Sequence, residues 1–245
     1  MEEKDFMKKP LVYLLTAGLA VSLISSGTTY AVGPSESNAT VNFTAPENNT
    51  VGPVDPTDPS QPNTDDPESN GNITGEEGPL SLDYVSHIDF GNQEISTTEG
   101  IYESTTTEPY IQVTDVRGTG AGWDVTAQAS NFSTEGDSAS LPGSTITLSN
   151  GEAASAAGLN EPYVESEIEL STGGEAANVV SAEPRVAEEP VNTAEGLGTW
   201  VTRWLAGEGS TENENVILTV PASTATAGTH TATITWTLST GPTGE

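Results

Sequence analysis

The chain has 245 residues, of which 36 are acidic and 6 are basic, and its net charge is −30. Only Arg117, Arg185 and Arg203 are basic beyond the first ten positions, so the chain has no positive surface to neutralise phosphates. We therefore predict no nucleic-acid binding. The absence of cysteine excludes a disulfide framework, a thiol nucleophile and a thiolate zinc site, and two histidines leave little for acid–base chemistry. We expect no catalytic residues, no bound metal and no cofactor.

The first 31 residues have the pattern of a secretory signal peptide. Three lysines among the first ten residues precede an apolar run over residues 11–24, and the small residues Thr29 and Ala31 occupy the −3 and −1 positions of a cleavage site. An uncleaved membrane anchor is the alternative, but this run would span only about 21 Å as a helix, against roughly 30 Å of bilayer hydrocarbon. We predict a signal peptide over 1–31 and a secreted mature chain without direct membrane insertion.

Residues 32–79 are predicted to be a disordered linker. Between residues 33 and 79 the sequence holds eight prolines and nine acidic residues but neither lysine nor arginine. Such a composition buries too little apolar surface to offset the entropy lost on ordering. Proline at every third position from Pro53 to Pro62 favours an extended, self-repelling chain. The segment is interpreted as a spacer through a thick surface layer, or as a tail without a role.

Residues 80–245 have the pattern of one all-β domain. Short alternating segments recur between clusters of Gly, Pro, Asn and Ser, which predicts an antiparallel sandwich or a barrel-like fold. Over residues 231–239 the apolar side chains share one face and hydroxyl side chains the other, as in a half-buried strand. The stretches 151–158 and 187–196 are expected to be helical turns or loops. The clearest predicted strands span residues 110–116, 123–129, 144–148, 164–170, 215–220 and 231–239.

Two tryptophans stand in the same local pattern. Val125 follows Trp123 at i+2, and Leu238 follows Trp236, so in a strand the two members of each pair point to one face. Packing in the core is the simpler interpretation, because truncating a buried Trp costs about 3–5 kcal/mol. An exposed platform for stacking on sugar rings is the alternative.

These two motifs resemble those of the WxL cell-wall-binding domain of Gram-positive surface proteins. The resemblance extends over residues 79–242 and includes the Asp-Val-Arg-Gly segment at 115–118 and the Gly-Thr-Trp segment at 198–200. Two positions depart from the family pattern. Val125 stands in place of Leu, and His230 stands in place of the usual Tyr, either as a surface strand residue or as a pH-sensitive group.

The resemblance implies non-covalent attachment to the bacterial cell wall at the cell surface, with peptidoglycan as the wall ligand. It also implies protein partners, namely other WxL proteins and a membrane-anchored WxL-interacting protein. A surface protein complex is therefore expected.

Trp200, Arg203 and Trp204 are candidates for the wall-binding surface. A spacing of four places both tryptophans on one side of a strand or a helix, where they would stack on sugar rings while Arg203 pairs with a carboxylate. The alternative is that both tryptophans complete the core. Asp115 and Arg117 likewise point to one face if the strand continues through them, or else form an internal salt bridge that holds the turn.

The charge of the domain constrains how it binds a wall. Residues 80–245 hold 24 acidic residues and 3 arginines, a net charge of −21, so long-range attraction to anionic wall polymers is absent. We expect short-range binding that strengthens as the carboxylates are screened. No catalytic constellation is present in the sequence, so we predict a protein that is not an enzyme. The alternative function is an adhesin or partner-binding subunit held to the wall through other proteins.

Overall fold

A computed structural model of the protein describes residues 36–65, 70–135, 137–157 and 160–241. The predicted signal peptide over 1–31 lies outside the described residues. The chain divides into two compact units, Met1–Asn42 and Phe43–Glu245. The second unit carries the fold that is described below.

The second unit is built from antiparallel strands, and the predicted all-β fold class is confirmed. The strands are β1 (Gly71–Ile73), β2 (Leu80–Ser86), β3 (Gly100–Ser104), β4 (Tyr110–Asp115), β5 (Trp123–Ala129), β6 (Phe132–Thr134), β7 (Asp137–Ser140), β8 (Thr145–Ser149), β9 (Glu152–Ala154), β10 (Tyr163–Val164), β11 (Glu167–Ser171), β12 (Ala177–Ala182), β13 (Gly198–Arg203), β14 (Asn213–Val220) and β15 (Ile234–Thr240).

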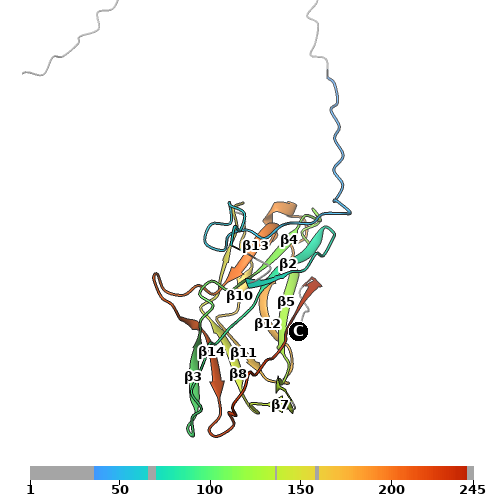
Figure 1. Ribbon diagram of the computed structural model, residues 1–245. Helices are drawn as coiled ribbons and strands as arrows, with labels where there is room; N and C mark the ends of the chain where they lie inside the picture. Colours follow the sequence, from blue (N-terminus) through green and yellow to red (C-terminus); the bar gives the residue numbers. More distant parts are fainter. Residues whose placement is uncertain (1–35, 66–69, 136, 158–159, 242–245) are drawn as a thin grey trace, which may run out of the picture. The chain divides into compact units, whose positions relative to one another are not determined.

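Three larger sheets and one hairpin organise these strands (Figure 1). The first sheet has the order β1-β2-β4-β13-β9, the second β10-β12-β5-β15, and the third β11-β8-β14-β3, while β6 pairs with β7. Within the described residues no sheet closes into a barrel, so of the two predicted architectures the open, layered one is present.

Most predicted strands are found close to their predicted bounds, and two segments differ. The predicted strand 164–170 is two strands, β10 and β11, which belong to different sheets. The stretch 151–158 contains strand β9 rather than a helical turn, because its backbone pairs with the edge of β13. The stretch 187–196 does contain a single 3₁₀ turn, Val191–Thr193.

Strand β15 shows the predicted alternation, with Ile234, Trp236 and Leu238 half-buried and Thr235 and Thr237 exposed. Its apolar face is only half-buried because β15 lies at the edge of the second sheet, where it pairs with β5 alone. The matching strand β5 lies between β12 and β15, and its inward side chains are completely buried.

One main core collects apolar side chains from all three larger sheets. The first sheet contributes Leu82, Ile111 and Val113, the second contributes residues of β5 and β12, and the third contributes residues of β8, β11 and β14. Trp123 and Trp204 are the largest fully buried side chains of this core.

The predicted linker over 32–79 is in part folded against the first sheet. Strand β1 pairs with β2. Residues 52–63, which we call the strap, lie against β4 and β13 of the first sheet. Val54 N donates to Gln112 Oε1 at 2.8 Å, and Asn63 Nδ2 donates to Tyr110 Oη at 2.9 Å. For the strap and β1 the prediction of a disordered linker is wrong.

The strap is ordered because it has apolar and polar partners that composition does not reveal. Val54 packs on a second, smaller core formed by Tyr84, Tyr110 and Val201. An antiparallel bridge between Val54 and Pro62 closes the strap into a loop. Because proline has no backbone N–H, the prolines of the strap leave no such donor unpaired against the sheet.

Candidate functional site

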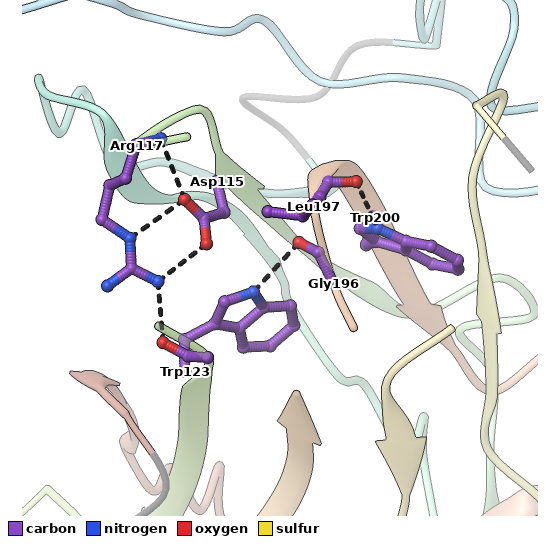
Figure 2. Close-up of polar contacts among 7 residues, drawn as sticks. Asp115, Arg117, Trp123, Gly196, Leu197 and Trp200 are labelled. Atoms are coloured by element: carbon purple, nitrogen blue, oxygen red, sulfur yellow. Dashed lines mark hydrogen bonds and ion pairs between the residues drawn. The ribbon is translucent and has the colours of Figure 1, made fainter. Parts of the chain in front are cut away.

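The first motif tryptophan belongs to the core. The Trp123 side chain is 0% exposed, and its indole Nε1–H donates to the Gly196 carbonyl at 3.1 Å (Figure 2). A Cβ on Gly196 would lie 2.6 Å from that nitrogen, so the contact requires glycine at this position. Val125 is also 0% exposed. Neither side chain of this motif is accessible to a wall polymer.

The second motif is more open. Trp236 and Leu238 are half-buried on β15 and pack against the main core. The Trp236 ring lies 6.1 Å from the ring of Trp204, tilted by 36°. Trp236 therefore presents part of its ring at the surface.

Trp200 and Trp204 do not form the predicted exposed pair. Trp200 is 4% exposed and donates from Nε1 to the Leu197 carbonyl at 2.9 Å, and Trp204 is 1% exposed within the main core. Trp200 lies on β13, and Trp204 directly follows that strand and packs in the main core. The sequence spacing fixes a common side but does not distinguish an inward side from an outward one.

Arg203 is likewise engaged within the fold. Its Nη1 donates to the carbonyl oxygen of Pro56 in the strap, and its Nη2 lies 3.4 Å from Glu152 Oε2. The guanidinium therefore joins β13 to the strap and to β9. The predicted role of Arg203 in pairing with a ligand carboxylate is not supported by these contacts.

Asp115 and Arg117 form the internal salt bridge that was one of the two predicted interpretations. Arg117 donates from Nε to Asp115 Oδ1 at 2.9 Å and from Nη2 to Oδ2 at 2.7 Å, and the Asp115 side chain is 0% exposed. Arg117 Nη2 also donates to the Gly122 carbonyl at 2.7 Å (Figure 2). The pair pins both ends of the loop between β4 and β5 and so positions Trp123.

The described surface has a groove of about 1090 Å³. It lies between residues 87–95, which follow β2, and residues 225–236, which lead into β15. The partly buried rings of Phe90, Tyr102 and Trp236 line it, together with polar side chains. These polar side chains are His87, Asp89, Asn92, Gln93, Glu94 and His230. Sequence reasoning missed this groove, because its residues come from segments distant in the chain.

His230 lies in the groove and is held by two contacts. Its Nδ1 is 2.8 Å from Ser140 Oγ, and its Nε2 is 2.9 Å from the Thr226 carbonyl. The residue is half-buried and precedes β15, so it lies just outside the strand in which it was predicted. Both histidines of the sequence line this one groove.

A buried carboxylate lies beneath the strap. Asp83 is 3% exposed and accepts hydrogen bonds from Ser81 Oγ and Thr114 Oγ1, each at 2.6 Å, and from Gln112 Nε2 at 3.0 Å. Gln112 Nε2 also donates to the Gly52 carbonyl at 3.1 Å. Burial raises the pKa of Asp83, although the three hydrogen bonds act in the opposite direction. The Asp83 network thus links the first sheet to the start of the strap.

We expect this carboxylate to make stability depend on pH. Because its pKa is raised, Asp83 binds a proton more tightly in the folded state than in the unfolded state. The stability that this protonation adds is fully present below the ordinary pKa of 3.8. The effect is lost as pH rises through the raised folded-state pKa. In urea denaturation, the stability of the wild type relative to Asp83→Asn should fall over this window and then level off. Glu103→Gln, an exposed charge loss on β3, is the control and should show no such fall; a constant wild-type difference would contradict the prediction.

The described residues offer no metal site and no membrane-crossing helix. No group of three or more acidic or histidine side chains in this part of the chain is placed to hold a metal ion. Likewise, none of its helices is long and apolar enough to cross a membrane.

The strands and the core together define an all-β domain in which the first motif is buried and the second packs against the core. Residues 31–242 match the family model of the WxL domain, described as a surface cell wall-binding domain. The match covers most of the chain, so the chain belongs to the WxL family, as the sequence motifs predicted. The family is one of cell-wall-binding domains rather than enzymes and places the protein at the cell surface. No curated protein and no solved structure matches the chain.

Proposed function

We propose that the protein is secreted by a Gram-positive bacterium and binds the peptidoglycan of its wall without a covalent link. The family's role in binding the cell wall and the predicted signal peptide support this proposal. Peptidoglycan offers glycan strands with apolar C–H faces and many hydroxyl groups. A surface that combines aromatic rings with amide and carboxylate side chains suits such a ligand.

The groove is the observation that carries this proposal. Trp236 is half-buried there, whereas Trp123, Trp200 and Trp204 are buried. Phe90 and Tyr102 offer further ring surface, and polar side chains along the groove are placed to bond sugar hydroxyls. We propose that glycan contact is made here rather than at Trp200, Arg203 and Trp204.

The charge of the domain favours contact at short range. The net charge of −21 over residues 80–245 repels anionic wall polymers at a distance. Salt shortens this repulsion, since the screening length is about 8 Å at physiological ionic strength. Binding through rings and hydrogen bonds therefore gains from added salt.

We expect the secreted chain to sediment with purified peptidoglycan stripped of teichoic acid, as strongly or more strongly at high salt than at low salt. Tyr102→Ala should weaken binding roughly 3- to 10-fold, the equivalent of about 0.5–1.5 kcal/mol for one aromatic contact. Ile101→Ala is the matched control, because Ile101 neighbours Tyr102 on β3 and is 65% exposed outside the groove. Binding that weakens steadily with salt, or that responds equally to both variants, would contradict the proposal.

The proposed partners are other WxL proteins and a membrane-anchored WxL-interacting protein. Repulsion from an anionic wall favours a second attachment through proteins, and this gives the alternative function of an adhesin or partner-binding subunit. The same sedimentation experiment separates the two functions. A folded chain that reaches peptidoglycan only when other surface proteins are added would support the alternative.

A further inference from the structure

Strand β15 leaves one of its two backbone edges open. Ser130 N donates to the Thr233 carbonyl at 2.8 Å, just before the strand begins. Gly241 N donates to the Gly122 carbonyl at 3.0 Å, just after the strand ends. Hydrogen-bonded and non-hydrogen-bonded pairs alternate in an antiparallel ladder, so the odd-numbered residues of β15 bond β5 and the even-numbered ones point their N–H and C=O groups away from it. These outward residues are Ile234, Trp236, Leu238 and Thr240.

The open edge borders the groove. No strand of the described chain other than β5 pairs with β15, and Ile234 and Trp236 line the groove. Residues 87–95 form the opposite wall. An extended polypeptide that lies in this part of the groove can therefore bond the outward N–H and C=O groups of β15. Open edges of this kind bind further strands.

The two faces of β15 define the side chains that such a strand needs. Ile234 and Trp236 are half-buried on one face, whereas Thr235 and Thr237 are exposed on the other. A strand added to the edge continues both faces, and its side chains pack beside those of β15. Its residues should therefore alternate, with apolar side chains that cover Ile234 and Trp236 and polar ones that lie beside the threonines.

The charge of the groove indicates a basic partner. Asp89 and Glu94 line the groove, and no lysine or arginine of the described residues lines it. A lysine or arginine at an end of the incoming strand would complement these carboxylates. The arginines of the domain bond elsewhere in the fold: Arg117 bonds Asp115, Arg185 bonds the Glu189 carbonyl, and Arg203 bonds the Pro56 carbonyl.

A second copy of this chain does not fit that requirement. Beyond the first ten positions its basic residues are these three arginines, each engaged within its own fold. The net charge of −21 over residues 80–245 also makes two copies repel each other. The complementary strand therefore belongs to a different protein.

We propose that an extended segment of another protein, with alternating apolar residues and a lysine or arginine at its ends, adds as a strand to the open edge of β15. The inference rests on the proposed function, in which partner proteins help to hold the chain at the wall, and it states where and by which chemistry one partner binds. The added strand covers Trp236, so this partner and a glycan exclude each other at that ring.

A synthetic peptide, Lys-Val-Thr-Val-Thr-Val-Lys with blocked ends, is the probe for NMR titration of the full secreted chain. At low salt it should bind at least about tenfold more tightly than its twin with Glu in place of Lys, and added salt should reduce this difference. At saturation the amides of Ile234, Trp236 and Leu238 should exchange at least about fivefold more slowly than in the free protein.

Two N-methylated forms of the peptide test the backbone ladder. One form is methylated at its valines and the other at its threonines, so each blocks the N–H groups of one edge and keeps every side chain. Only the form that blocks the edge facing β15 should lose binding. Equal binding of both forms, or equal loss in both, would show that the peptide does not add as a strand.

A protein variant tests the charge. Glu94→Gln should weaken binding of the lysine peptide about 2- to 5-fold, as expected for one partly exposed ion pair. Glu103→Gln is the matched control and should bind as the wild type does, because Glu103 is exposed on β3 outside the groove.

Three further outcomes would overturn the proposal. These are equal affinity for the lysine and glutamate peptides, unchanged exchange of the three amides at saturation, and slow exchange without peptide that depends on protein concentration. The last result would assign the edge to a second copy. No wall material enters the titration, so a chain that sediments with peptidoglycan but ignores the peptides overturns this inference alone. A chain that binds the lysine peptide but does not sediment overturns the proposed wall binding alone.

Discussion

A chain that begins at Leu80 is expected to be much less stable than the secreted chain. This truncation removes the strap and β1, and it exposes Tyr84 and Tyr110, which are 1% and 2% exposed in the fold. Each large apolar side chain contributes about 1.5–3 kcal/mol when buried, so the loss should reach roughly 3 kcal/mol or more. The truncation also leaves the Asp83 network open on the strap side, where Gln112 bonds Gly52.

Urea denaturation followed by circular dichroism measures this loss. The matched control is a chain that begins at Glu47, which also lacks residues before the strap but keeps the strap and β1. It should retain most of the stability that the Leu80 chain loses. Equal stability of the two truncated chains would show that the strap does not support the first sheet, and the domain would then begin at residue 80 as composition predicts.

The order of the strap could not be predicted from composition. Eight prolines and nine acids among residues 33–79 indicate correctly that the segment carries little apolar surface of its own. Tyr84, Tyr110 and Val201 form an apolar patch on the outer side of the first sheet, and the composition of the linker does not reveal this patch. That patch exists only once β2, β4 and β13 pair, so a segment that covers it is identified by tertiary contacts alone.

Strands were predictable where the sequence alternates, and their faces were predictable where one face is apolar. The strand at residues 123–129 was predicted with its observed bounds, and the predicted strand 231–239 overlaps β15, which begins at Ile234. The spacing of Trp200 and Trp204 suggested an exposed pair, but both rings are buried, and whether a face is covered depends on tertiary contacts. The groove combines residues from β2 to β15, so periodicity within one segment carries no signal for it.

The second large effect is expected at the first motif tryptophan. Trp123→Ala should cost about 3–5 kcal/mol of stability, because the ring is completely buried and would leave a cavity. Trp123→Phe keeps most of the apolar volume but loses the indole hydrogen bond to the Gly196 carbonyl, and a smaller cost of about 1–2 kcal/mol follows. Trp236→Ala should cost less than Trp123→Ala, since Trp236 is half-buried at a sheet edge.

Denaturation of the three variants, combined with sedimentation on peptidoglycan, separates the roles of the two motifs. Trp236→Ala should weaken wall binding while the domain stays folded, whereas Trp123→Phe should leave wall binding unchanged. A stable Trp123→Phe variant that no longer binds peptidoglycan would contradict the core assignment. In the expected outcome the two motifs differ in function despite their shared pattern. Trp123, with the Asp115–Arg117 pair beside it, holds the sheets together, and Trp236 presents a half-buried ring at the surface.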